Sequence, residues 1–263
     1  MFFTLPTNIC FLMTKEFRYL DETYFMLDNL DLTKVLCLDI ETVPQYADFS
    51  TMDERWQHLW QKKAQFLVKE DQTPESIYSR AGIYAEFGKI VCISVGAFLR
   101  SGNEWHFKLK SFYGDDEKML LEEFCQMLNR WNADNDKLLC AHNGKEFDYP
   151  YIARRCLLNG VSVPRMLDLA GKKPWEVALL DTMELWKFGD FKSFTSLDLL
   201  AASFNIPTPK DDIDGSRVWE VYWKDKDVER IKTYCQKDVV TVAQLLLRFR
   251  GEKIMDEGNV LYA

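Results

Sequence analysis

The sequence has few of the residues that build disulfide frameworks or zinc sites. Histidine occurs only three times in 263 residues, and none of the seven cysteines stands in CxxC spacing. A zinc site made from paired cysteine and histidine is therefore not expected. The cysteines are odd in number and several lie in apolar runs, which indicates buried, reduced thiols in a cytoplasmic protein.

An excess of positive charge is also missing, since the formal net charge is −8. This charge argues against a broad basic surface of the kind that coats nucleic acid. It leaves room for a locally basic groove and for an acidic site whose charge is offset by metal ions. We expect any nucleic-acid affinity to be modest and sensitive to salt.

A long apolar run is absent as well. Residues 2–13 (FFTLPTNICFLM) are apolar, but they lack a positively charged start, a small-residue cleavage site and the length to span a bilayer. We therefore expect no membrane partner and disfavour a signal peptide. Met13 and Met26 offer later starts, so residues 1–28 are interpreted as an N-terminal extension that precedes the true start or belongs to the protein. One domain is predicted over 29–251, with a C-terminal tail over 252–263.

Apolar runs and turn signals predict alternating strands and helices. Strands are expected at 34–40, 89–99, 104–113, 137–141 and 177–180, the second and third forming a hairpin. Helices are expected at 51–68, 115–131, from 148, at 196–204 and at 227–249, and a cap at 73–76 suggests another. The order predicts an α/β domain with a mixed five-stranded sheet and helices on both faces, and with its chemistry at the strand ends.

Acidic residues in three separate segments carry the functional argument. Asp39 and Glu41 lie two apart in VLCLDIET, so they share one side of a strand. Asp148 follows a buried strand and a turn, and Asp238 lies four residues after Tyr234, on the same face of a helix. Buried carboxylates are costly unless neutralised, and Mg²⁺ or Mn²⁺ is their natural partner. Because paired divalent ions hydrolyse phosphodiesters, the first hypothesis is a metal-dependent nuclease.

Each motif has a simpler interpretation when it is taken alone. A strand often ends in polar residues, Asp148 could be a helix N-cap, and Tyr234 could lie at a core boundary. The combination is more specific. DIE, NGKEFD and YxxxD resemble, in order and spacing, the DEDD (DnaQ-like) superfamily of 3′–5′ exonucleases. The tyrosine at 234, with Thr233 where the other branch has histidine, matches the DEDDy branch.

The stretches LCLDIETVP, EFGKIVCIS, AHNGKEFD, DIDGSRVW and YCQKDVV are similar to stand-alone bacterial proteins related to the proofreading exonuclease domain of family B DNA polymerases. The resemblance covers roughly residues 30–250. It implies a ribonuclease H-like three-layer fold and two divalent cations, Mg²⁺ or Mn²⁺. It also implies a site made of Asp39, Glu41, Asp148, Tyr234 and Asp238.

The roles that the resemblance implies differ among these residues. Asp39, Glu41 and Asp238 would ligate the metal that binds the attacking water, and Asp39 would bridge to the second metal. Asp148 would act on that second metal, partly through water. Tyr234 would orient the attacking water, since a phenol with a pKa near 10 is a poor base.

Weaker candidates surround the motifs. Residues expected to contact the 3′ end of the substrate are Thr42, Val43, Asn143, Phe147, Lys210 and Ser216. Phe147 could equally be a core residue, and solvated loop positions are the simpler interpretation of Lys210 and Ser216. We interpret His142 as a structural histidine, Asp181 as a helix cap, and Asp211, Asp212 and Asp214 as turn formers.

Three functions remain open at this point. The first is a 3′–5′ exonuclease that acts on single-stranded DNA ends, in proofreading or DNA repair with a polymerase or repair partner in trans. The second is an exonuclease that trims RNA 3′ ends, because recognition of the 2′-hydroxyl depends on groove shape. The third is a catalytically weak module that binds nucleic acid or a protein partner, which the complete acidic set disfavours.

Overall fold

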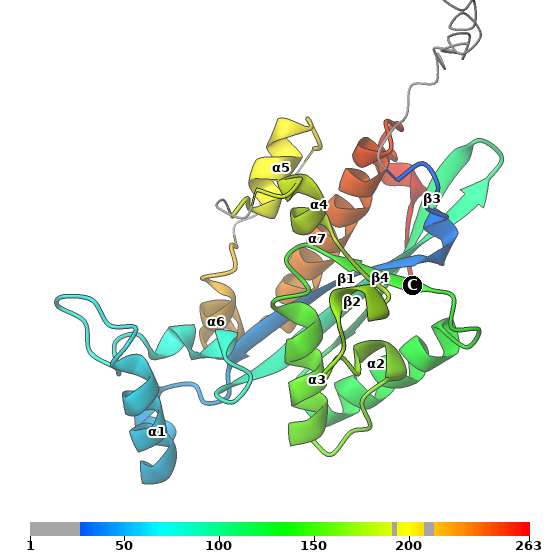
Figure 1. Ribbon diagram of the computed structural model, residues 1–263. Coiled ribbons are helices and arrows are strands. Elements are labelled where there is room, and N and C mark those ends of the chain that lie inside the picture. The colour runs from blue at the N-terminus through cyan, green and yellow to red at the C-terminus, as the bar shows by residue number, and fades with distance from the viewer. Residues whose placement is uncertain (1–26, 191–193, 208–212) are drawn as a thin grey trace, which may run out of the picture.

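The structure is a computed structural model that describes residues 27–190, 194–207 and 213–263 (Figure 1). The interpretation of the N-terminal extension, apart from its last two residues, lies outside the described residues. The predictions for Lys210, Asp211 and Asp212 lie outside them too.

A mixed sheet forms the centre of the molecule. The strands run in the order β5-β4-β1-β2-β3-β6. Pairs β1–β2 and β2–β3 are antiparallel, whereas β1–β4, β4–β5 and β3–β6 are parallel. The bounds are β1 Val35–Pro44, β2 Gly88–Ser101, β3 Glu104–Tyr113, β4 Leu138–Ala141, β5 Leu179–Asp181 and β6 Val260–Tyr262. The α/β class is confirmed, with six strands in place of the predicted five.

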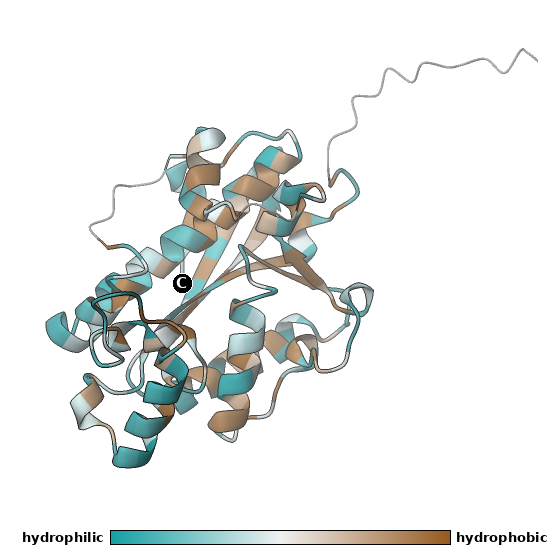
Figure 2. Cartoon of the chain, turned by 60° about the vertical axis from the view of Figure 1, so that its left-hand side comes forward, coloured by the Kyte–Doolittle hydropathy of each residue, from teal (hydrophilic) through white to brown (hydrophobic). Residues whose placement is uncertain are grey.

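Helices cover both faces of the sheet because β1 is apolar on both sides (Figure 1). Leu36 and Leu38 point into a core shared with α2 (Glu117–Trp131) and α3 (Asp148–Leu158). The alternate residue, Cys37, packs in a second core with α7 (Val228–Phe249) on the opposite face. Figure 2 shows hydrophobic colour on the strands and hydrophilic colour on the outer turns of the helices.

Shorter helices complete the fold. They are α1 Glu54–Ala64, α4 Thr182–Lys187, α5 Leu197–Ser203 and α6 Val218–Glu220, and α6 continues into a π-helical turn, Val221–Asp225. The 3₁₀ turns are Leu32–Lys34, Phe49–Thr51, Tyr78–Ile83, Arg165–Leu167, Pro174–Glu176 and Glu257–Asn259. The predicted cap at 73–76 begins no α-helix. The Thr73 and Ser76 side chains accept hydrogen bonds from each other's backbone N–H, and the 3₁₀ turn Tyr78–Ile83 follows.

The sixth strand comes from the segment interpreted as a tail. Residues of β6 pair with β3 from Phe107 to Leu109, so this segment extends the sheet. Just before it, Arg250 Nη1 donates to the carbonyls of Leu27 and Leu30, each at 2.6 Å. The two ends of the described chain are thereby tied together. No helix in the described ranges is long and apolar enough to cross a membrane.

Candidate active site

The first two carboxylates lie toward the end of the central strand. Asp39 and Glu41 point to the α7 face of β1, the side on which Cys37 packs. The pairing of β1 with β2 shifts register between Glu41 and Thr42. Such a bulge increases the local twist and re-aims side chains next to functional sites. Glu41 is nevertheless buried, with 7% of its surface exposed.

Helix α7 crosses this pair of carboxylates and brings the third motif to them. Tyr234 and Asp238 lie one turn apart on α7, and both are half-buried. Between them, Cys235 Sγ lies 3.4 Å from the backbone oxygen of Asp39. Ligand atoms of Asp39, Glu41 and Cys235 lie within 4.8 Å of one another. The segments that carry the first and third motifs therefore lie close together.

Asp148 joins the site from α3. It is buried, and its Oδ1 accepts a hydrogen bond from the backbone N–H of Ile40 at 3.2 Å. The N-cap position of α3 is Phe147, which makes no side-chain cap hydrogen bond. Asp148 is thus not the N-cap that its sequence context allowed, and one of its oxygens is tied to the strand that carries Asp39 and Glu41.

Burial and like charge set the electrostatics of the cluster. The pKa of Asp39 is raised well above its usual range by burial and then by the charges of Asp238 and Asp148. The pKa of Glu41 is raised by burial and then by Asp39 and Asp238. Burial also raises the pKa of Asp148 to about 7. Four carboxylates close enough to disturb one another are the signature of a site that expects a positive ligand.

The donor set fits a hard divalent cation. Asp39 Oδ2 is buried and has no hydrogen-bond partner within the described residues, so one strong acceptor is available for a ligand. Carboxylate oxygens are what Mg²⁺ and Mn²⁺ prefer. Burial raises the pKa of the neighbouring Cys235 thiol, which keeps it a neutral neighbour of these oxygens. A divalent metal site at this point of the sheet is the natural interpretation.

Tyr234 carries a neutral phenol in this setting. Its pKa is raised mainly by burial and then by the charge of Asp238 and the other site carboxylates. Deprotonation at neutral pH is therefore strongly disfavoured. A neutral phenol can donate a hydrogen bond, which is what the orienting role implied by the resemblance requires.

The predicted substrate residues occupy different surroundings. Asn143 has a left-handed backbone (φ 60°), and its buried Oδ1 has no partner among the described residues. Phe147 packs against the core and against Tyr151, with ring centroids 5.4 Å apart, which supports its structural interpretation. Thr42 is half-buried, whereas Val43 is fully buried, so its side chain offers no wedge to a ligand.

Three polar residues near the motifs have structural partners. His142 Nδ1 lies 2.9 Å from Thr182 Oγ1, and its Nε2 lies 2.9 Å from the Thr195 carbonyl. Asp181 caps α4 and also accepts backbone N–H groups from the turn at 143–145. Ser216 is exposed, and its backbone N–H donates a hydrogen bond to the Asp214 side chain. Asp214 is therefore a turn former, as predicted.

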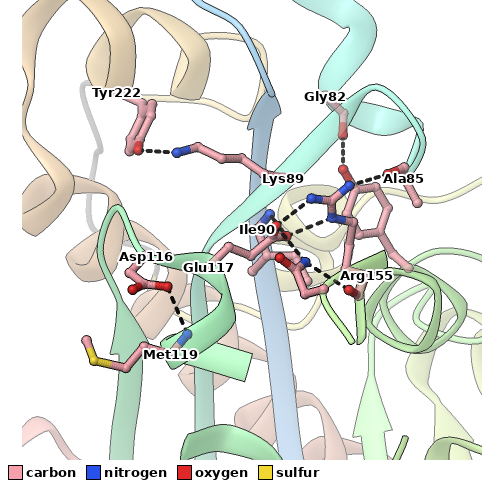
Figure 3. A network of polar contacts seen from close by, with 11 residues as sticks. Gly82, Ala85, Lys89, Ile90, Asp116, Glu117, Met119, Arg155 and Tyr222 are labelled. Carbon is pink, nitrogen blue, oxygen red and sulfur yellow. Dashed lines mark hydrogen bonds and ion pairs between the residues drawn. The ribbon is translucent and has the colours of Figure 1, made fainter. Parts of the chain in front are cut away.

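Sequence reasoning missed a second buried carboxylate, on the other face of the sheet. Glu117 accepts hydrogen bonds from Arg155 Nε at 2.8 Å and Nη2 at 2.5 Å, from Asn159 at 3.0 Å and from the backbone of Ile90 at 2.7 Å (Figure 3). Its partners are 27 to 42 residues away in the chain. The residue spacings used to predict contacts within one helix therefore could not reveal this network.

Two comparisons with known proteins bear on the fold and the family. Residues 83–256 match the family of predicted 3′–5′ exonucleases related to the exonuclease domain of PolB. The match includes Asp148, Tyr234 and Asp238, whereas Asp39 and Glu41 precede it and reach the site through β1. No curated protein matches the chain.

A solved structure shows the same fold. The chain is similar to the family B DNA polymerase from the hyperthermophilic archaeon Pyrobaculum calidifontis, with 17% identity and a TM-score of 0.50 over 81% of this chain. It spans 24% of the length of that polymerase. The fold is therefore that of a polymerase exonuclease domain, as the ribonuclease H-like prediction required. On the family match, which spans residues 83–256, the chain belongs to the family of predicted 3′–5′ exonucleases related to the exonuclease domain of PolB.

Proposed function

We propose that the protein is a metal-dependent 3′–5′ exonuclease that hydrolyses single-stranded DNA from its 3′ end with two divalent cations, Mg²⁺ or Mn²⁺. The observation that carries the proposal is that Asp39 and Glu41 lie close together on β1, within reach of the charges of Asp148 on α3 and Asp238 on α7. Their mutual effect on pKa and the unpartnered Asp39 Oδ2 are costs that bound cations would offset.

The site residues have different roles in this proposal. Asp39, Glu41 and Asp238 would hold the cation that activates the attacking water, and Asp39 and Asp148 would serve the second cation. Bound cations supply a nucleophilic water near neutral pH and offset charge that develops on the phosphate. Tyr234, held neutral, donates a hydrogen bond that orients the water. The Ile40 N–H bond to Asp148 leaves one carboxylate oxygen for this work.

Substrate contacts in this proposal come from the turn after β4 and the end of β1. Asn143 presents a buried amide oxygen without a partner in the described chain, which fits a hydrogen bond to the terminal nucleotide. Thr42 and the backbone of Val43 flank Glu41 and face the 3′ end. Phe147 supports this turn from the core, and Lys210 and Ser216 belong to the segment that follows α5.

The polymer is proposed to be DNA because the structural neighbour is a DNA polymerase. A shared fold also fits a role in proofreading or repair, with a polymerase or repair partner in trans. RNA is the alternative substrate, and the 2′-hydroxyl of its sugar is what lets a protein distinguish it from DNA. The experiment below therefore compares DNA and RNA as substrates.

The test compares 5′-labelled single-stranded DNA and RNA oligonucleotides of one sequence with Mg²⁺, Mn²⁺ or EDTA. Wild type should shorten DNA from its 3′ end in steps of one nucleotide, should need a cation, and should lose this activity in Asp39→Asn. Faster shortening of RNA would reassign the substrate. A failure to cleave either polymer with either metal would overturn the proposal.

A further inference from the structure

A second polar cluster lies beyond the carboxylates on the same face of the sheet. A pocket of about 440 Å³ is lined by Lys89, Asp115, Tyr222, Trp223, Lys226 and Val228, called here the lysine pocket. Its walls come from β2, the loop before α2, the π-helical turn and the start of α7. None of these residues belongs to the DIE, NGKEFD or YxxxD motif, although Lys89 lies in the stretch EFGKIVCIS.

Lys89 reaches into this pocket with donor capacity to spare. Its Nζ donates to Tyr222 Oη at 2.6 Å (Figure 3), and within the described residues this is its only hydrogen bond. An ammonium carries three N–H groups, so two remain for a ligand. The side chain is half-buried, and burial lowers its pKa. A partly desolvated cation with free donors attracts an anion more strongly than a solvated one does.

Aromatic rings hold the second lysine at the pocket. Lys226 Nζ lies 4.7 Å from the centroid of the Trp223 ring, and Lys89 Nζ lies 5.4 Å from it. Trp223 is itself fixed by a hydrogen bond from Nε1 to the Pro44 carbonyl at 3.0 Å. Both ammonium groups are therefore positioned by one anchored ring, at an entrance that stays open to solvent on the Lys226 side.

The lining of the pocket carries more positive than negative charge. Asp115 accepts the Tyr222 hydroxyl proton at 2.5 Å. Outside the lining, Asp227 caps α7, and Asp225 lies 3.5 Å from Arg230. Two lysines thus face one lining carboxylate. In a chain of net charge −8, such a pocket is a local exception.

The lysine pocket lies in line with the carboxylates. Val43 shares the face of β1 that carries Asp39 and Glu41, and it pairs with Lys89 in the sheet. Glu41 and Val43 are two residues apart, about 7 Å along a strand. That separation matches roughly two stacked nucleotides at about 3.4 Å each. One hydrophobic cluster joins Val43 and Tyr222 to Tyr234 of the site.

We propose that the lysine pocket binds a backbone phosphate of the substrate strand, a few nucleotides from the 3′ end, and so holds the strand while its terminus is cut. This inference rests on the proposed function and adds where the strand leaves the site. Phosphate contacts position a strand without reading its sequence, so the pocket should serve all sequences alike. It also gives a protein of net negative charge a defined place for a polyanion.

The test uses substrates that do and do not reach the pocket. Lys226→Gln, Lys89→Met and the double variant are compared with Lys224→Gln. Lys224 is exposed, two residues from Lys226, and it pairs with Glu220 over the Trp219 ring outside the pocket. Kinetics are measured on a twelve-nucleotide oligothymidylate and on the p-nitrophenyl ester of thymidine 5′-monophosphate over a range of salt concentrations.

Each pocket lysine should contribute about fivefold to kcat/KM for the oligonucleotide at about 0.1 M salt. Each should also contribute about 0.7 to the slope of log(kcat/KM) against the logarithm of the salt concentration. The loss should appear in KM, while rates on the nitrophenyl ester and all rates of Lys224→Gln stay at wild type. Because Lys226 is exposed, its variant keeps the test valid even if Lys89→Met unfolds.

Three results would overturn the inference. Equal KM and salt slope for wild type and Lys226→Gln, with both substrates cleaved, would exclude the pocket and leave the exonuclease intact. Thermal stabilisation by inorganic phosphate that is lost in Lys226→Gln, with unchanged oligonucleotide kinetics, would assign the pocket to a free phosphate. A wild type that cleaves neither substrate would remove the proposed function, and this inference with it.

Discussion

Two buried carboxylates, Glu117 and Glu41, lie on opposite faces of one sheet. The first is paired with a positive charge, whereas the second is surrounded by further negative charges. Glu117 and Glu41 are each 7% exposed. Glu117 is held by Arg155, Asn159 and a backbone N–H, so its charge is satisfied within the protein. Glu41 lies beside further carboxylates that raise its pKa. Burial alone therefore says little about function, whereas the chemistry of the partners says much.

The two sites differ because the Glu117 site has a structural role, whereas the site at Glu41 is proposed to bind a ligand. A carboxylate with a complete set of donors fixes α2 to α3 and to β2, and it has no capacity left for a ligand. At the other site, burial and the charge of Asp39 raise the pKa of Glu41, and a bound cation would offset this electrostatic cost. Breaking the first site should therefore reduce stability, and breaking the second should reduce activity.

The largest effect is expected from Asp39→Asn. Removing the carboxylate that contacts the rest of the site should lower the exonuclease rate by roughly 10³-fold or more, because charge stabilisation of the transition state is lost. Unfolding of the metal-free protein should become no easier, since a buried like charge is removed. Cleavage assays and thermal unfolding measure the two quantities.

The matched control for Asp39→Asn is Asp136→Asn, an exposed aspartate paired with Lys34 at 2.8 Å. It should leave the rate at wild type. Retention of more than a tenth of the activity in Asp39→Asn would contradict the assignment of the site.

Arg155→Leu should have the opposite profile. It leaves Glu117 buried without its charged partner, which should cost about 3–5 kcal/mol of unfolding free energy. Adding Leu at both positions should recover part of that loss, because no unpaired charge then remains. Urea denaturation with and without Mg²⁺ measures the effect, and a loss that Mg²⁺ reverses would show that the two sites are coupled.

The metal should stabilise the protein more as the pH rises. The pKa of Asp148 is raised to about 7, above the usual 3.8, so this group contributes stability that is complete below about pH 4 and is lost as the pH rises through about 7. Between pH 6 and pH 8 the metal-free protein should therefore lose stability. A divalent cation at 100 times its Kd should restore about 2.7 kcal/mol at the higher pH.

Thermal unfolding at pH 6 and pH 8, each with Mg²⁺ or EDTA, measures this effect. Asp39→Asn should lose most of the Mg²⁺ response at both values of pH. A shift that is equal at pH 6 and pH 8 would mean that the carboxylates of the site are already ionised without a metal.

The smallest effect is expected from Tyr234→Phe. The phenol is kept neutral and orients water, so its loss should reduce kcat by about 10- to 100-fold, as for residues that position a metal-bound group. The pH profile should keep its shape, because Tyr234 takes no proton in the proposed role. A profile displaced toward higher pH would indicate that the hydroxyl ionises in wild type.

Much of the active-site face could be predicted from the sequence because the pattern there is local. Asp39 and Glu41 lie two apart on a strand, and Tyr234 and Asp238 four apart on a helix, so backbone geometry alone orients each pair. The apolar runs of β1, β2 and β4 fixed the sheet in the same way. Joining the three motifs required a family pattern, since no local rule brings residue 39 to residue 238.

The features that could not be predicted from the sequence all depend on contacts between segments that are distant in the chain. Glu117 and Arg155 lie on separate helices, where a charge normally faces solvent, and only the packing of α2 against α3 buries both. The strand β6 is three residues long and follows a polar turn, so its pairing with β3 decides its structure. The lysine pocket depends on a π-helical turn that places Tyr222 and Trp223 against β2, and no spacing rule encodes it.

The contact between Cys235 and Asp39 joins residues 196 positions apart, and this separation governs when the enzyme can first exist. A ribosome that adds about 5–20 residues per second needs roughly 10–40 s to make that interval. Throughout this time the nascent chain holds β1 with its acidic pair but lacks α7, the helix that carries the proposed ligand Asp238. Nuclease activity is therefore expected only after α7 has been synthesised and has docked on β1.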